Sequence, residues 1–131
     1  YPLRSVCTIS THDMATLRGW WEEDPELTAR YYNQVLGQWG EVPTSAPGWA
    51  CEEIVRQHLE SPSLLCILAF QDWLSMDEDL RYPDANAERI NVPANPRHYW
   101  RYRMHLSVEQ LAAANEFNAT LSGMIADCGR K

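Results

Sequence analysis

The sequence lacks a long hydrophobic run, and no stretch approaches the roughly 18 apolar residues that a membrane-spanning helix needs. It also lacks the charged, apolar and small-residue succession of a secretory signal peptide. No CxxC pair occurs among its four cysteines, which disfavours the common zinc and redox motifs. We therefore predict no membrane partner, no metal and no cofactor, and we expect reduced thiols in a cytoplasmic protein.

Positive charge and phenylalanine are also scarce. Eleven Lys and Arg stand against 18 Asp and Glu, which gives a formal net charge of −7 and excludes nucleic acid as a natural partner. Two Phe accompany six Trp and six Tyr. Trp and Tyr combine an apolar face with a polar tip, which suits sugar rings and equally suits any hydrated interface.

Two short stretches have the composition of strands. Residues 4–10 are rich in β-formers, and residues 64–70 read Leu-Leu-Cys-Ile-Leu-Ala-Phe, a continuous run typical of a strand buried on both faces. A short buried helix is the alternative for the second run. Polar residues follow both stretches directly, His12 and Asp13 after the first and Gln71 and Asp72 after the second.

Three segments carry helix signals. Asp24 is a good N-cap before Pro25, and the spacing of Leu27, Tyr31 and Val35 predicts a helix over residues 24–36 that ends before Gly37. A second helix is expected over residues 47–59, with Cys51, Ile54, Val55 and Leu59 buried. Ser107 and Gln110 form a capping box that opens a long terminal helix ending at Gly129. Its predicted apolar face comprises Val108, Leu111, Phe117, Leu121, Met124 and Ile125.

The order strand, two helices, strand, long loop and helix is typical of an α/β fold. Ligands of such folds bind at the carboxyl ends of parallel strands, where His12, Asp13 and Asp72 fall. Two strands cannot close a sheet, and the chain opens without Met, so we expect residues 1–131 to be one piece of a larger α/β assembly. Residues 77–103 have no period and contain three prolines, which predicts a long and functional loop.

Three stretches resemble the 4-alpha-glucanotransferase family, which comprises amylomaltases and disproportionating enzymes. Residues 8–21, Thr-Ile-Ser-Thr-His-Asp-Met-Ala-Thr-Leu-Arg-Gly-Trp-Trp, resemble the segment at the seventh barrel strand. Residues 70–74 resemble the end of the eighth strand, and residues 88–103 resemble the loop that follows it. His-Tyr-Trp-Arg-Tyr-Arg at residues 98–103 is closer to the long form of the enzyme, and Ala94 departs from the usual glycine of the compact bacterial form.

The resemblance implies that the chain is the C-terminal part of a (β/α)8 TIM-type barrel, about strands 7–8 with flanking helices, predominantly α-helical as an isolated piece. It implies transfer of α-1,4-glucan segments between maltodextrins by a retaining double displacement. The remainder of the barrel would be the partner of this piece. The nucleophile and the acid/base are expected upstream of Tyr1, so the isolated chain should be inactive, and its open strand edges could self-associate.

The resemblance also implies roles for particular residues. Asp13 matches the acid that stabilises the transition state, and His12 matches a histidine that binds a sugar hydroxyl. Asn91 and Pro93 lie in the loop that borders the active site in the family, and Asp72 is a candidate sugar contact.

Each assignment has a structural alternative. A His-Asp pair after a strand is often only a turn, and Asp72 could cap the next turn or bind Arg89. One of Trp20 and Trp21, at least, is expected in the core. The arginines of residues 97–103 could bind phosphate, but the acidic composition favours ion pairs.

Two functions of other classes remain as alternatives for the whole chain. A carbohydrate-binding module would explain the aromatic residues but not the helices. A helical protein-interaction domain would explain the helices but not the acids that follow both strands.

Overall fold

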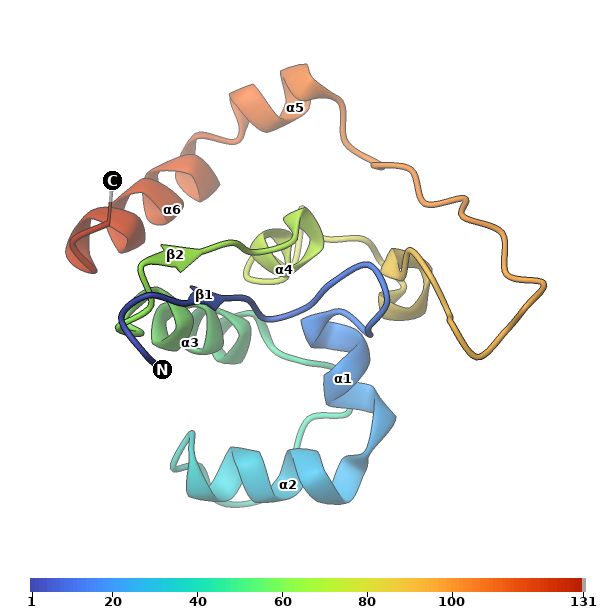
Figure 1. Ribbon diagram of the computed structural model, residues 1–131, viewed down its shortest axis with the longest axis horizontal. Helices are drawn as coiled ribbons and strands as arrows, with labels where there is room; N and C mark the ends of the chain where they lie inside the picture. The colour runs from blue at the N-terminus through green and yellow to red at the C-terminus, as the bar shows by residue number, and fades with distance from the viewer. Residues whose placement is uncertain (131) are drawn as a thin grey trace.

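The computed structural model describes residues 1–130, and the fold is mainly helical (Figure 1). Its elements in chain order are β1 (Val6–Cys7), α1 (Leu17–Glu23), α2 (Pro25–Gln34), α3 (Gly48–Leu59), β2 (Leu65–Cys66), α4 (Phe70–Leu74), the 3-10 helix η1 (Ala85–Glu88), α5 (Val108–Ala113) and α6 (Asn115–Asp127).

The two strands lie side by side and run parallel, with Val6 opposite Leu65 and Cys7 opposite Cys66. The Ile67 amide donates to the Cys7 carbonyl at 2.9 Å, which continues the ladder past β2. A parallel pair brings the chain that leaves β1 and the chain that leaves β2 to the same end of the sheet. His12 and Asp13 follow β1 at that end of the sheet, and Gln71 and Asp72 follow β2 there.

The core has two parts that share helix α3. One part packs α1 and α2 on α3 through Leu17, Trp21, Tyr32 and Ile54. The other packs α6 against the end of α3 and against β2. Trp21 is 1% exposed and its indole N–H donates to the Pro43 carbonyl at 2.8 Å, so the prediction of a core tryptophan is confirmed.

The run at residues 64–70 is not a buried strand, and that prediction is wrong. Only Leu65 and Cys66 pair with β1, Leu65 and Ile67 are 51% and 60% exposed, and Phe70 already begins helix α4. Residues 4–10 likewise give only the two-residue β1, with Val6 56% exposed. The physical reason is that no further strand pairs with β1 or β2 within residues 1–130.

Helices α2 and α3 confirm the predicted positions, with one error in the buried face. Asp24 caps α2 by accepting from the Glu26 and Leu27 amides, and Gly37 adopts φ +65° just beyond the helix. However, Leu27 and Val35 are exposed, and α2 buries Thr28 and Tyr32 instead because α1 and α3 cover that side. In α3 the buried residues include the four that the spacing predicts.

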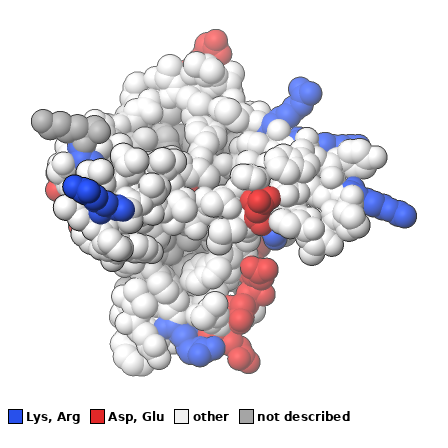
Figure 2. Space-filling view, viewed as in Figure 1, with Lys and Arg blue, Asp and Glu red and all other residues white. Residues whose placement is uncertain are grey.

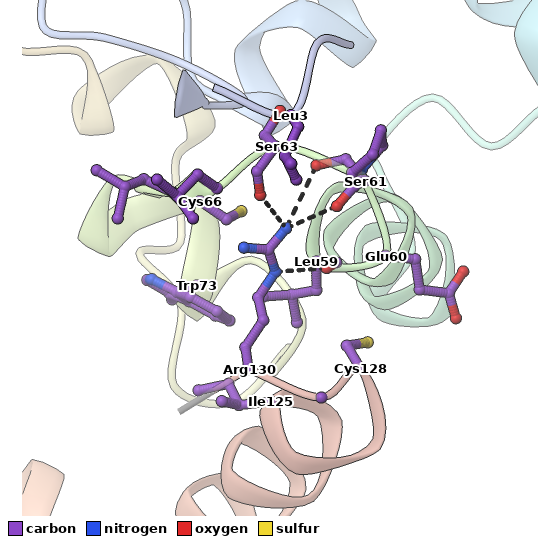
Figure 3. A pocket seen from close by; sticks show the side chains of 14 residues that line it. Leu3, Leu59, Glu60, Ser61, Ser63, Cys66, Trp73, Ile125, Cys128 and Arg130 are labelled. Atoms are coloured by element: carbon purple, nitrogen blue, oxygen red, sulfur yellow. Dashed lines mark hydrogen bonds between the residues drawn. The ribbon is translucent and has the colours of Figure 1, made fainter. Parts of the chain in front are cut away.

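The prediction of one long terminal helix is confirmed at its start, but it is wrong in expecting a continuous helix. Ser107 and Gln110 form the expected capping box, but Ala114 leaves helical geometry at ψ 66° and divides the segment into α5 and α6. Phe117 and Met124 are buried, whereas Val108 is 73% exposed. Beyond α6, Arg130 donates to the carbonyls of Leu59, Ser61 and Ser63 and lines a cavity of about 630 Å³ at the end of α3 (Figure 3).

Residues 77–103 form the expected loop, apart from the single turn η1. After η1 the chain runs along the outside of the molecule to reach α5 (Figure 1). None of the helices in the described part of the chain is long and apolar enough to cross a membrane.

Candidate functional site

An exposed polar cluster lies beyond the carboxyl end of β1. The Asn91 side-chain amide donates to Asp13 Oδ1 at 2.7 Å, and His12 Nε2 lies 3.3 Å from Asp13 Oδ2. The His12 and Asp13 side chains are 55% and 51% exposed. The structure therefore brings together three of the five candidate site residues, and it leaves the carboxylate accessible to a ligand.

Trp100 adds an aromatic wall that the site prediction did not include. Its ring centroid lies 5.5 Å from that of His12, and 62% of the residue is exposed. The backbone amide of Asn91 donates to the His12 carbonyl at 3.1 Å. Asn91 therefore joins its own segment to the segment of His12 and Asp13 through both its backbone and its side chain. An exposed indole beside hydrogen-bonding groups is a surface on which a sugar ring can stack. The aromatic composition was the sequence signal for such a wall, but it did not identify Trp100.

Local turns explain how the two segments present these side chains. Residues 11–14 form a turn closed by the Met14 amide and the Thr11 carbonyl at 3.1 Å. Thr16 then caps α1 by accepting from the Gly19 amide. In the other segment, the Asn95 amide donates to the Val92 carbonyl at 2.8 Å, with Pro93 at the second position of the turn, where its fixed φ fits. Pro93 is exposed and makes no polar contact with Asp13.

Asp72 does not belong to this exposed cluster, contrary to our prediction of a sugar contact. The residue is 0% exposed and lies in the first turn of α4. Its carboxylate accepts from the Ser10 hydroxyl and, at 2.8 Å, from the Leu17 amide. Burial raises the pKa of Asp72, and the hydrogen bonds from Leu17 and Ser10 oppose that rise. In this structure Asp72 has a structural role beneath the candidate site.

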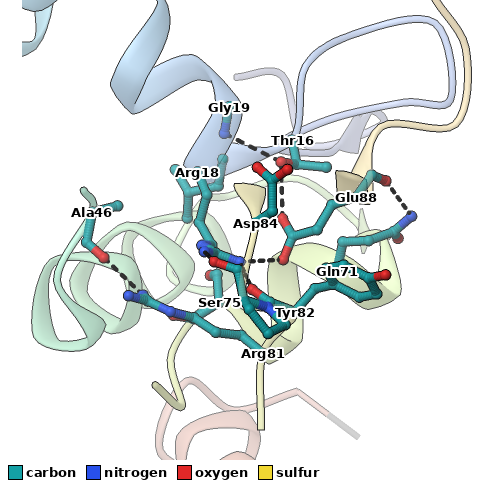
Figure 4. Close-up of polar contacts among 12 residues, drawn as sticks. Thr16, Arg18, Gly19, Ala46, Gln71, Ser75, Arg81, Tyr82, Asp84 and Glu88 are labelled. Atoms are coloured by element: carbon teal, nitrogen blue, oxygen red, sulfur yellow. Dashed lines mark hydrogen bonds and ion pairs between the residues drawn. The ribbon is translucent and has the colours of Figure 1, made fainter. Parts of the chain in front are cut away.

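A buried ion pair between Arg18 and Glu88 joins α1 to η1 (Figure 4). Arg18 Nη1 lies 2.5 Å from Glu88 Oε1 and also donates to the Tyr82 carbonyl. The Thr16 hydroxyl donates to the other oxygen of Glu88 at 3.2 Å. Burial raises the pKa of Glu88, and the Arg18 guanidinium opposes that rise. Sequence reasoning missed this pair because its members are 70 positions apart and neither carries a local signal of burial.

The arginines of the long loop do not form the ion pairs that we expected. In the part of the chain that the structure describes, Arg97, Arg101 and Arg103 make no salt bridge with a carboxylate. Arg101 lies over the Tyr99 ring, 4.7 Å from its centroid. Figure 2 shows blue side chains projecting at the edge of the molecule where this loop runs. The prediction of ion pairs is wrong, since none of these three arginines lies within 4.0 Å of a carboxylate oxygen in the described residues.

The chemistry available to the cluster is hydrogen bonding to hydroxyl groups and stacking on an apolar ring face. None of the polar contacts of Asp13 within residues 1–130 involves a second carboxylate. A retaining glycosyl transfer requires two carboxyl groups about 5 Å apart, and these contacts do not supply them. The described residues contain no group of three or more His, Cys, Asp or Glu side chains arranged to hold a metal ion.

Comparison with known proteins identifies the class. The sequence matches the 4-alpha-glucanotransferase family of glycoside hydrolase type 77 over residues 1–108. The chain therefore belongs to this family, which confirms the resemblance that its motifs carry.

Individual relatives agree with the family. The chain is 37% identical over 130 residues to 4-alpha-glucanotransferase DPE2 of Oryza sativa subsp. japonica, covering 99% of this chain and 14% of the rice protein. It is 34% identical over 121 residues to a 4-alpha-glucanotransferase of Chlamydia muridarum, covering 92% of this chain and 22% of that protein. The chain thus spans less than a quarter of the length of these relatives.

A solved structure shows the same fold. An amylomaltase from Streptococcus agalactiae, determined in complex with acarbose, superposes with a TM-score of 0.69 at 22% identity. The match covers 99% of this chain and 23% of the amylomaltase chain.

Proposed function

We propose that this chain forms part of a 4-alpha-glucanotransferase that transfers α-1,4-glucan segments between maltodextrins. We assign the chain to about strands 7–8 of a TIM-type barrel, with the rest of the barrel as its partner. The parallel pairing of β1 and β2 supports this assignment, as do the polar residues that follow each strand. In barrels of this kind the active site lies at the carboxyl ends of the strands.

The observation that carries the proposal is the 2.7 Å contact between Asn91 and Asp13, made across 78 positions of sequence. It joins two motifs that resemble the family independently, and it does so at an exposed surface. Asn91 binds Oδ1 of Asp13 and His12 Nε2 lies 3.3 Å from Oδ2, and each oxygen of the carboxylate has a second lone pair that can bind a ligand.

In the proposed reaction Asp13 accepts hydrogen bonds from sugar hydroxyls. The transition state of glycosyl transfer resembles an oxocarbenium ion, so these bonds strengthen as positive charge develops on the ring. Interactions that are stronger in the transition state than in the ground state accelerate the chemical step. His12 donates to a neighbouring hydroxyl, Trp100 stacks on the apolar face of a sugar, and Pro93 shapes the turn that borders them. The nucleophile and the acid/base come from the remainder of the barrel.

The test is Asp13→Ala in the full-length protein, with release of glucose from maltotriose as the assay. We expect kcat to fall at least about 100-fold while KM changes little, the scale of losing one stabilising group. Asp79→Ala is the matched control, because Asp79 is exposed and its side chain makes no hydrogen bond in the described chain. An Asp13→Ala enzyme that keeps more than half of the parent kcat would contradict the role of Asp13. Absence of glucan transfer by the parent would contradict the function itself.

The location of the protein stays a prediction. We propose the cytoplasm, since all four cysteines are free in this structure. Fractionation of the source cells with an antibody to the protein tests it.

A further inference from the structure

The segment that carries His12 and Asp13 is an exposed loop between β1 and α1. Within residues 11–14, one backbone hydrogen bond, from Met14 to Thr11, closes its turn. Both side chains are more than half exposed, so packing does little to fix their positions. A group that must meet a sugar accurately therefore needs to be held from outside the loop.

Asp72 holds both ends of this loop. One carboxylate oxygen accepts from the hydroxyl of Ser10, where the loop begins, and the other accepts from the amide of Leu17, where α1 begins. Ser10 and Leu17 are 5% and 3% exposed, so both bonds are shielded from water. A single side chain therefore bonds both ends of the loop, between which Asp13 lies, and connects them to helix α4.

Asp72 is itself held in place. The Ser75 hydroxyl donates to the Asp72 carbonyl at 2.6 Å, and the Asp72 amide donates to the Ala69 carbonyl at 3.0 Å. The residue sits in the first turn of α4, directly after the sheet.

The neighbouring residue holds the other half of the site. Gln71 donates from its side-chain amide to the Glu88 carbonyl at 3.2 Å, three residues before Asn91 (Figure 4). Gln71 is 5% exposed, so this bond is also buried. Adjacent residues of one short helix thus connect to the segment of Asp13 and to the segment of Asn91.

We propose that Asp72 is a positioning residue for glucan transfer, which fixes the loop that carries Asp13. The proposal rests on the assignment of Asp13 under the proposed function. Because Asp72 has no exposed surface, it acts on the substrate only through that loop. Displacement of a reacting group by about 1 Å is enough to cost about 100-fold in rate.

The experiment compares Asp72→Asn and Asp72→Ala in the full-length protein, assayed on maltotriose. Asparagine keeps the shape and both bonds, because its oxygen accepts from Leu17 and its amide donates to the Ser10 hydroxyl. Alanine removes both bonds. We expect kcat of Asp72→Ala to fall about 100-fold with KM little changed, and Asp72→Asn to recover most of that loss. Equal losses in the two variants, or a loss confined to KM, would overturn the proposal.

A double substitution separates positioning from a general loss of structure. If Asp72 acts through Asp13, Asp72→Ala changes kcat by less than about threefold once Asp13 is already alanine. Losses that multiply in the double variant would show that Asp72 acts elsewhere and would overturn the proposal. Should Asp72→Ala fail to fold, Ser10→Ala removes one bond and leaves Leu17 paired. Its kcat should fall about tenfold, with the same dependence on Asp13, and an unchanged kcat would overturn the proposal.

The two proposals fail in different ways. If Asp13→Ala retains the parent kcat, the role of Asp13 is refuted, and the positioning proposal falls with it. If Asp13→Ala is impaired and Asp72→Ala is not, only the positioning proposal is refuted.

Discussion

Replacing Glu88 with glutamine tests whether the buried ion pair holds α1 against η1. The side chains of Arg18 and Glu88 are 3% and 2% exposed, and Arg18 Nη1 lies 2.5 Å from Glu88 Oε1. Glutamine has nearly the same volume, so the substitution removes the negative charge and leaves little cavity. Arg18 then keeps only neutral acceptors, the carbonyls of Tyr82 and Pro83.

The expected cost follows from the burial of the charge that remains. Removing one partner of a buried pair leaves an uncompensated ion, which destabilises a protein by about 3–5 kcal/mol. Arg18 Nε already has no hydrogen-bond partner in the described structure. The guanidinium therefore has few other polar contacts that could stabilise its charge once Glu88 is replaced. The loss is large against the roughly 5–15 kcal/mol that holds a domain together.

Glu52→Gln is the matched control. Glu52 pairs with Arg56 one helical turn away at 3.1 Å, but these side chains are 39% and 31% exposed. A pair of this kind on a helix contributes only about 0.3–0.5 kcal/mol. The two substitutions therefore make the same chemical change in buried and exposed surroundings.

Native-state hydrogen exchange at pH 8 measures the difference, because burial raises the pKa of Glu88 and a higher pH favours its ionised form. Amides of α1 and η1 in Glu88→Gln should open at least about 100-fold more often than in the parent. In Glu52→Gln they should be unchanged. Equal exchange of these amides in the two variants would refute the reasoning, and so would a Glu88→Gln protein with parental protection.

Four further outcomes are expected. The purified 131-residue chain should release no glucose from maltotriose, because the retaining mechanism needs two carboxyl groups about 5 Å apart; enzyme-dependent glucose release would contradict this expectation. In light scattering the same chain should self-associate through the exposed Val6, Leu65 and Ile67. A monomer at all concentrations would contradict that. Burial raises the pKa of Cys51 to about 11, so the thiolate is about 0.1% of the thiol at pH 8 and the buried sulfur should resist iodoacetamide. Cys66, with its pKa also raised to about 11 but with part of its surface exposed, should react about tenfold faster at pH 9 than at pH 8; labelling of Cys51 in the folded protein as fast as in urea would contradict the argument.

Sequence patterns predicted the elements whose signals are local. The Asp24 cap and the Ser107–Gln110 box are set by residues two or three positions apart, and the structure contains both. Which side of a helix is buried is not local, and so α2 buries Thr28 and Tyr32 rather than Leu27 and Val35. That choice depends on the neighbouring helices, which a period in one segment does not reveal.

The candidate site divides in the same way. His12, Asp13 and Asn91 stood out because they lie in motifs, and the structure brings them together. Asp72 stood out for its place after a strand, but its burial depends on Ser10 and Leu17, more than 50 positions away. A polar residue that follows a strand can serve the ligand or the scaffold, and only the fold decides between them. The sequence analysis did not predict helix α1, although Thr16 is a residue type that favours the N-cap position.

The contacts that join the separate segments in and around the candidate site have large sequence separations, which has a consequence for the order of folding. Asp72 reaches Ser10 across 62 residues, Arg18 reaches Glu88 across 70, and Asn91 reaches Asp13 across 78. Closing such loops costs conformational entropy before any of these bonds can form, whereas α2, α3 and α6 need only neighbouring residues. The helices can therefore form early, and the site is among the last parts to assemble. A partly folded chain would have most of its helical circular dichroism while Asp13 and Asn91 were still apart.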